Sequence, residues 1–361
     1  MKKSIYLFLL IGIMLITSLT ACAFNWKFWQ KRAVNPAEIP VAAVTDFEII
    51  PTMDSVSNAK NQVWVGTFQL VWNDLVNELI KHPVEFVGYK SVMAENLNKQ
   101  TFTTDDISVS AYYRKWGLAS PKLRKEIEDG IKEKFNETSD ILDMFNWTPE
   151  DGKYFLYAML KKDFQYVQPF NKLEDAPFNG SKDNVKYFGI DKNSSDSLKH
   201  NIEVLFYNNS QDYAVSIKSK TDDIIYLYRT NDNKTLDVLY KDMKRKYKFY
   251  SGEKSMGAQD LFKAPIIDFK NEIEFDEICN KPIKNTNFFI SKAVETVQFK
   301  MDETGVKLKS EAGMMTQKLM IAEKEQPRYF YFNDRYVIFL EEYGKKPYFA
   351  MKIEDAKKLQ N

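Results

Sequence analysis

Residues 290–340 read ISKAVETVQFKMDETG, VKLKSEAGMMTQKLMIAEKEQPR and YFYFNDRYVIFL in succession. Val294–Met301 and Tyr329–Leu340 are rich in β-branched and aromatic residues, which predicts strand structure in each. The polar connection between them is several times longer than the about 4–6 residues that usually join two elements. A connection of this length is usually either functional or disordered. We therefore expect the function of the chain to involve this loop.

The composition describes a folded protein without a bulk charge. The 361 residues suffice for two ordinary domains or one large one, and a hydrophobic content of 44% supports a substantial core. Lys and Arg number 51 against 50 Asp and Glu, so overall charge does not support nucleic-acid binding. No glycine-rich phosphate loop, metal-ligand cluster or cofactor motif occurs in the sequence.

The N-terminus has the pattern of an export signal. Lys2 and Lys3 precede the apolar run Ile5–Ile16, and residues 1–21 therefore predict a signal peptide. The run is shorter than the ~20 residues that span a bilayer. The following Leu-Thr-Ala-Cys resembles a bacterial lipoprotein box, which implies that Cys22 is lipidated, with palmitate among the acyl groups. This places the mature protein on the extracytoplasmic face of the cell membrane; a plain signal peptide or membrane anchor is the alternative.

Residues 22–61 are expected to link the lipid to the folded part. The segment Ala23–Arg32 mixes aromatic and basic side chains, as interfacial segments do. Alternatively, its aromatic residues pack onto the domain. Pro36 and Pro40 predict an extended spacer, and residues 62–361 are expected to form a single domain.

Helix signals come first along this domain and strand signals later, which predicts an α+β fold. An apolar face recurs at helical spacing from Phe68 to Ile80, and Val84–Phe145 reads as mainly helical. Within that range Ser120-Pro121 begins a helix over Leu123–Phe135, and Ser139 precedes a short helix over Asp140–Phe145. The later segments predicted as strands are Lys153–Lys161, Asn201–Tyr207, Tyr213–Lys218, Ile224–Arg229 and Pro265–Phe275, with a basic helix at Leu236–Lys248.

Residues of catalytic type do not form a recognisable set. With Cys22 lipidated, Cys279 has no partner within the chain and is expected to be a half-buried apolar residue. The two histidines, His82 and His200, have no spacing that places either beside it. The acidic pairs Asp222-Asp223 and Glu341-Glu342 are adjacent in sequence, and on a strand adjacent residues point to opposite faces. We therefore expect no enzymatic activity.

Four segments resemble the serpin family, over roughly residues 62–353. They are YFLYAMLKKDFQYVQPFNKLEDAPF, with Phe164 in place of the usual tryptophan and Pro169-Phe170 matching; APIIDFKNEIEF; ISKAVETVQFKMDETG; and YFNDRYVIFLEEYGKKPYFAMKI, with Arg335-Tyr336 where Pro-Phe is common. The family's Ser-Pro-x-Ser segment is not found, and FVGYKSVMAE stands there instead. The resemblance implies N-terminal helices packed on a large central mixed sheet, a second smaller sheet and a long exposed loop.

The family mechanism inserts this loop into the central sheet as a new strand. The resemblance makes Glu303, Thr304, Gly305, Val306 and Leu308 the hinge of the loop. On a strand every second side chain enters the core. The residues then pointing inward are Val306, Leu308, Ser310, Ala312 and Met314.

Burial of the apolar residues on this face favours insertion, whereas the bulk of Leu308 would slow it. We therefore expect a non-inhibitory or weakly inhibitory protein whose loop is open to proteolysis or partner binding. One alternative is an inhibitor of serine or cysteine proteases, with its scissile bond near Leu319-Met320 or at Lys318. Another is an envelope scaffold that binds a peptide or hydrophobic ligand. The same loop residues could instead extend the preceding strand as a hairpin arm. A monomer is expected, and its partners are the membrane, through Cys22, and a protease or a peptide or protein ligand.

Overall fold

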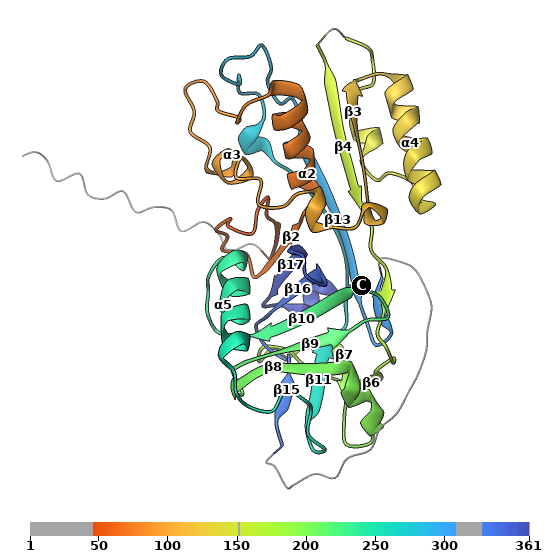
Figure 1. The fold of residues 1–361 in the computed structure, drawn as a ribbon, viewed down its shortest axis with the longest axis vertical. Helices are drawn as coiled ribbons and strands as arrows, with labels where there is room; N and C mark the ends of the chain where they lie inside the picture. Colours follow the sequence, from red (N-terminus) through yellow and green to blue (C-terminus); the bar gives the residue numbers. More distant parts are fainter. Residues whose placement is uncertain (1–45, 151, 308–326, 361) are drawn as a thin grey trace, which may run out of the picture. The chain divides into compact units, whose positions relative to one another are not determined.

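The largest sheet of the described residues has seven strands (Figure 1). The computed structural model describes residues 46–150, 152–307 and 327–360. The strands, in spatial order, are β1 (Phe47–Ile49), β2 (Asn61–Val65), β17 (Pro347–Ile353), β16 (Tyr336–Glu342), β10 (Asp223–Arg229), β9 (Asp212–Lys218) and β8 (Ile202–Asn209). All neighbours are antiparallel except β1 and β2. Every residue of β16 and β17 is buried, which explains their nearly continuous apolar sequences.

The described residues also form three smaller sheets. The first contains β15 (Tyr329–Tyr331), β11 (Leu261–Pro265), β7 (Asn184–Ile190) and β6 (Asn171–Pro177); the second β12 (Ile267–Glu274), β13 (Val294–Met301), β14 (Gly305–Lys307) and β5 (Phe164–Gln165); the third β3 (Tyr112–Leu118) and β4 (Tyr154–Leu160). Strand β4 is followed directly along the chain by β5, so the second and third sheets are covalently continuous.

The helices are few and mostly belong to the first half of the chain. They are α2 (Thr67–Asp74), continued by the π-helix η2 (Leu75–Ile80), α3 (Val92–Leu97), α4 (Pro121–Phe135), α5 (Leu236–Phe249) and the 3₁₀ turns η3 (Thr104–Asp106), η4 (Val109–Ala111), η5 (Leu142–Met144), η6 (Asp196–Asn201), η7 (Asp276–Ile278) and η8 (Ala356–Leu359). Helix α4 begins as expected, because Ser120 Oγ accepts a hydrogen bond from the amide of Leu123 at 3.2 Å. None of the described helices is long and apolar enough to cross a membrane.

In the part of the chain that the structure describes, the buried apolar residues form two separate clusters. The larger one joins the seven-stranded sheet, α2, α5 and the inner faces of β12 and β13. The smaller one lies between α4 and β4, around Ile127, Ile131, Trp147 and Phe155. Strand β4 contributes to both, since Phe155 and Tyr157 face α4 while Ala158 belongs to the larger cluster.

The α+β fold class is confirmed, and some of the expected boundaries move. Part of the segment expected as a linker belongs to the fold, because β1 pairs with β2, and Ile49 and Ile50 are buried. Val84–Phe145 is not mainly helical, since β3 pairs along its whole length with β4. The expected helix over Asp140–Phe145 is reduced to the 3₁₀ turn η5. The region Tyr329–Leu340 is divided between β15 and β16, which belong to different sheets.

Candidate functional site

Strand β14 is the point at which the predicted loop begins, and it lies between two other strands. Gly305 and Val306 pair with Gln165 and Phe164 of β5, and Val306 and Lys307 pair with Met301 and Lys300 of β13. Both pairings are antiparallel, so β14 is a middle strand with three residues. Neighbouring strands lie about 4.7–4.9 Å apart, and β5 and β13 are therefore separated by the width of one strand.

The turn before β14 is fixed by backbone hydrogen bonds to the segment after β5. The amide of Tyr166 donates to the carbonyl of Thr304 at 3.1 Å, and the amide of Phe170 donates to the carbonyl of Glu303 at 2.8 Å. Gly305 is required at this point, since a Cβ there would collide with the backbone carbonyl of Phe164. Val306 is fully buried, as the predicted inward alternation requires.

Beyond β14, strand β4 and most of β13 each have one edge that pairs with no described residue. Among the described residues, β4 pairs with β3 alone, and β13 pairs with β14 only at Lys300 and Met301. Residues 154–160 of β4 and 294–299 of β13 thus face each other across an interval without pairing. An unpaired strand edge offers backbone N–H and C=O groups to another strand.

A cleft of about 1510 Å³ occupies this interval. One wall is β4 and the other is β13, and helix α2 with η2 forms the floor through Phe68, Val71, Trp72, Leu75 and Leu79. Small-molecule pockets are typically about 300–1,000 Å³. The size of this cleft and its two strand edges suit an extended peptide segment better than a compact ligand.

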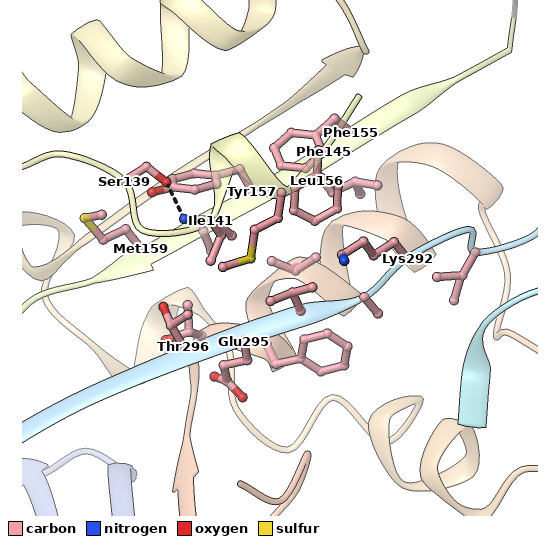
Figure 2. Close-up of a pocket in the computed structure, with 18 of the residues that line it drawn as sticks. Ser139, Ile141, Phe145, Phe155, Leu156, Tyr157, Met159, Lys292, Glu295 and Thr296 are labelled. Atoms are coloured by element: carbon pink, nitrogen blue, oxygen red, sulfur yellow. Dashed lines mark hydrogen bonds between the residues drawn. The ribbon is translucent and has the colours of Figure 1, made fainter. Parts of the chain in front are cut away.

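The segment after α4 also reaches the cleft (Figure 2). Ile141 and Phe145 lie beside β4, and across from them β13 carries Thr296, with Lys292 just before it. Ser139 Oγ accepts hydrogen bonds from the amides of Ile141 at 3.2 Å and Leu142 at 3.3 Å. The cleft is therefore partly filled by side chains of the chain itself.

Glu295 is the unusual residue of the β13 wall. It shares the inner face of the strand with Val297, Phe299 and Met301, and only 4% of it is exposed. No side chain among the described residues donates a hydrogen bond to either carboxylate oxygen. Burial raises the pKa of Glu295 to about 8, and the backbone amide of Phe68 offsets only part of this rise.

At the junction of β4 and β5, Lys162 joins the cleft wall to the seven-stranded sheet. Its ammonium lies 2.7 Å from Asp223 Oδ1 of β10 and 2.5 Å from Glu342 Oε1 of β16. Glu342 also accepts hydrogen bonds from Ser108 and pairs with Lys345 at 2.9 Å. Burial raises the pKa of Glu342, but the hydrogen bonds from Lys162, Lys345 and Ser108 outweigh it and lower that pKa to about 2.

Glu341 points to the other face of β16, as adjacent strand residues must. It accepts hydrogen bonds from the hydroxyls of Tyr226 (2.7 Å) and Tyr240, and Lys244 pairs with it at 2.7 Å. Both members of this acidic pair are thus buried and bonded to basic or hydroxyl groups. This arrangement stabilises the sheet and leaves neither carboxylate directed at a cavity.

The structure brings together part of the predicted site. Glu303, Thr304, Gly305 and Val306 adjoin β5 as described above, whereas the other predicted site residues lie outside the described residues: Cys22, Leu308, Lys318, Leu319 and Met320. Cys279 is buried, more completely than expected, and its thiol lies 3.4 Å from the carbonyl of Phe275. Burial raises the pKa of that thiol, which agrees with a packing role.

Sequence reasoning missed the cleft, Glu295 and the Lys162 cluster. Glu295 lies at an inward position of an alternating strand. A charged residue among apolar inward positions is visible in the sequence and could have singled it out. Lys162 gave no local signal, because its partners are 61 and 180 residues away in the sequence.

Comparison with known proteins gives a likeness in structure only. No protein-family model and no curated protein matches the sequence. Among solved structures, the chain is similar to the crystal structure of Serpin48, described as a highly specific serpin in the insect Tenebrio molitor. The two are 11% identical, with a TM-score of 0.43, and the match covers 80% of this chain and 95% of the other.

Proposed function

We propose that this protein is a serpin-like protein, held on the extracytoplasmic face of the cell membrane by a lipid on Cys22, that accepts an added strand between β4 and β13. The observation that carries the proposal is the position of β14. It is paired on both sides at one end of a cleft, and within the described part of the chain the two walls of that cleft have unpaired edges. Continuation of β14 along this cleft would satisfy both edges with backbone hydrogen bonds.

The register of β14 specifies what a longer strand would meet. Val306 opposes Phe164 on one side and Met301 on the other. Carried forward, the same register sets position 312 opposite Ala158 of β4 and position 311 opposite Thr296 of β13. Ala312 is a small residue, which suits a position between two strands and above the helix α2.

We propose a protease substrate or weak inhibitor in preference to a strong one. Leu308 is bulky and lies between two lysines in the sequence, where an efficient trap would need small residues that enter quickly. Slow insertion gives an attacking protease time to complete hydrolysis. The proposed action is binding without catalysis, because Asp223, Glu341 and Glu342 are each bonded to lysine or tyrosine.

The test is to cleave the protein without its lipid anchor with a panel of serine and cysteine proteases. We expect a clean cut between residues 308 and 326, no SDS-resistant complex with the protease, and a rise in melting temperature after the cut, since the released strand can pair in the cleft. An unchanged melting temperature contradicts strand acceptance. A stable protease complex contradicts the weak-inhibitor form of the proposal and favours a protease inhibitor.

The lipid anchor is tested separately. The variant Cys22→Ser should leave the membrane fraction and appear in the soluble fraction, because the acyl chains would no longer hold it. A variant that still sediments with membranes contradicts the proposed lipidation. Cys279→Ser is the matched control and should remain with the membrane.

A further inference from the structure

Helix α5 presents a basic face to solvent. Its exposed residues recur at intervals of three or four and end with a phenylalanine: Val238, Lys241, Arg245, Lys248 and Phe249. Residues at this spacing lie on one side of a helix, and we call this set the basic face. The whole helix contains five Lys and Arg against two Asp. The basic face therefore combines positive charge with exposed apolar side chains.

The opposite side of α5 is fixed to the seven-stranded sheet. Three apolar side chains of the helix are fully buried, and the ring of Tyr240 meets that of Phe339 in β16 with centroids 5.2 Å apart. Lys244 pairs with Glu341 of the same strand at 2.7 Å. Because these contacts prevent the helix from turning on the sheet, the basic face keeps one direction relative to it.

The three most exposed large apolar side chains of the described residues come from α5 and from segments that adjoin it. They are Val56, Tyr343 and Phe249, which are 86%, 80% and 75% exposed. Val56 belongs to the loop between β1 and β2, in which the carbonyl of Met53 accepts a hydrogen bond from the amide of Asp237 in α5 at 3.0 Å. Tyr343 lies in the turn between β16 and β17, near the last turn of α5. Exposed aromatic rings among lysines are typical of surfaces at a membrane interface.

The first described residues lead into this region. Asp46 directly precedes β1, and the loop after β1 carries Met53 and Val56. Cys22 and Asp46 are 24 positions apart, so even a fully extended chain could separate them by no more than about 80 Å. A short covalent link raises the effective concentration of a surface that it can reach. A membrane that holds Cys22 would therefore lie within reach of the basic face.

We propose that the basic face of α5 and Tyr343 form a second membrane contact, which binds the headgroups of anionic phospholipids. The proposal rests on the lipid anchor of the proposed function, because that anchor would bring α5 to a membrane. Lys and Arg are attracted to the negative charge of such a surface, and the rings of Phe249 and Tyr343 can enter the headgroup layer. Because α5 is fixed to the seven-stranded sheet, this contact would also set the orientation of the sheet on the membrane.

Vesicle binding by the protein without its lipid anchor tests the contact. We expect the protein to sediment with vesicles that contain about one-third phosphatidylglycerol, and not with vesicles of phosphatidylcholine alone. Lys241→Ala with Lys248→Ala should weaken this binding about 25-fold, and Phe249→Ala should weaken it about fivefold. Added salt should weaken the binding of the wild type, because it screens the charges.

Lys182→Ala with Lys192→Ala is the matched control, because it removes the same charge from exposed positions. These two lysines flank β7, which lies apart from α5 in Figure 1. The vesicle affinity of this control should equal that of the wild type. Equal affinity in every variant, or equal binding to both kinds of vesicle, overturns the proposal. Binding to dextran sulfate without binding to anionic vesicles would assign the basic face to a soluble polyanion, and also overturns it.

The lipidated protein gives a second readout. On anionic vesicles a water-soluble acetylating reagent should modify Lys241 and Lys248 more slowly than on phosphatidylcholine vesicles, whereas Lys182 should react equally on both. Equal modification of Lys248 on both kinds of vesicle contradicts the membrane contact and leaves the lipid anchor standing. If the lipidated protein sediments with neither kind of vesicle, the lipid anchor is wrong, and the binding of the anchor-free protein still decides the contact.

Discussion

The seven-stranded sheet and the cleft differ in how completely their strands are paired. In the sheet, β10 and β16 pair with a neighbour on each side, and both faces of β16 are buried. At the cleft, β4 and most of β13 have one edge that is not paired with any residue that the structure describes. The difference shows that the cleft, unlike the sheet, is bordered by strand edges to which a further strand could pair.

The buried carboxylates repeat this contrast. Glu342 in the sheet is surrounded by two lysines and Ser108, whereas no side chain among the described residues donates a hydrogen bond to the carboxylate of Glu295 at the cleft. A buried charge without a partner destabilises the folded state, and one with partners is retained. The two regions should therefore respond to pH in opposite directions.

Glu295→Gln should have the largest effect. The pKa of Glu295 is about 8 in the folded state against an ordinary value of 4.5, so the folded protein binds the proton more tightly than the unfolded chain. The stability of the wild type should thus fall as pH rises from 4.5 to 8, by up to about 5 kcal/mol at about 1.4 kcal/mol per pH unit. Urea unfolding at several pH values should show that the unfolding free energy of the variant does not fall over this pH range.

The matched control for Glu295 is Glu272→Gln on the neighbouring strand β12. Its side chain is exposed, and the pH dependence of stability should remain that of the wild type. If the unfolding free energy of wild type and Glu295→Gln depended equally on pH, this carboxylate would be solvated or paired. The buried carboxylates of the sheet and of the cleft would then not differ.

Phe339→Ala tests the packing of the seven-stranded sheet. Phe339 is fully buried in β16 and meets the ring of Tyr240 with centroids 5.2 Å apart. Its truncation should cost about 3–5 kcal/mol of unfolding free energy, seen as a lower urea midpoint. Leu156→Ala on the cleft wall should cost about 1–2 kcal/mol, because that half-buried side chain borders open space. An equal loss of unfolding free energy in the two variants would contradict the difference in packing between the sheet and the cleft wall.

Glu342→Gln should produce the opposite pH response from Glu295→Gln. Since the pKa of Glu342 is lowered to about 2, the carboxylate contributes stability above pH 4.5 and loses it as pH falls toward 2. The variant should lose about 3 kcal/mol at pH 7 and flatten the acid limb of a stability curve. Glu174→Gln, which is exposed on β6, serves as the control and should keep the acid limb.

Gly305→Ala should have the smallest effect on global stability. The added methyl group would collide with the carbonyl of Phe164, so β14 must move away from β5 at a cost of about 1–3 kcal/mol. Faster hydrogen exchange of the β14 amides, with little change elsewhere, would locate the effect. At Gly257 an added Cβ meets only the Asp260 carboxylate at 3.5 Å, so Gly257→Ala should leave β14 protected.

Much of the fold could be predicted from the sequence because local patterns carry it. The alternation of Val294–Met301, the apolar face from Phe68 to Ile80 and the Ser120 cap all appear in the structure as expected. Strand β3 was missed because its sequence, Tyr112–Leu118, has one charged pair and a glycine, and its identity depends on pairing with β4. Tertiary pairing of this kind overrides local propensity.

The candidate site could be predicted only where it is continuous in sequence. The turn Glu303–Gly305 and the inward position of Val306 followed from a single stretch. The cleft depends on the placement of β4, β13 and α2, which come from separate parts of the chain. Lys162 binds carboxylates from two distant strands, and no local pattern encodes such a cluster.

The Lys162 cluster has a consequence for the direction in which the cleft can fill. Lys162 fixes the β4 wall to the seven-stranded sheet, and Phe299 fixes the β13 wall by stacking on Phe349, with centroids 4.4 Å apart. Both attachments lie near β14, so the walls are immobilised at that end. Pairing would therefore begin at Gly305 and extend along the cleft one residue pair at a time.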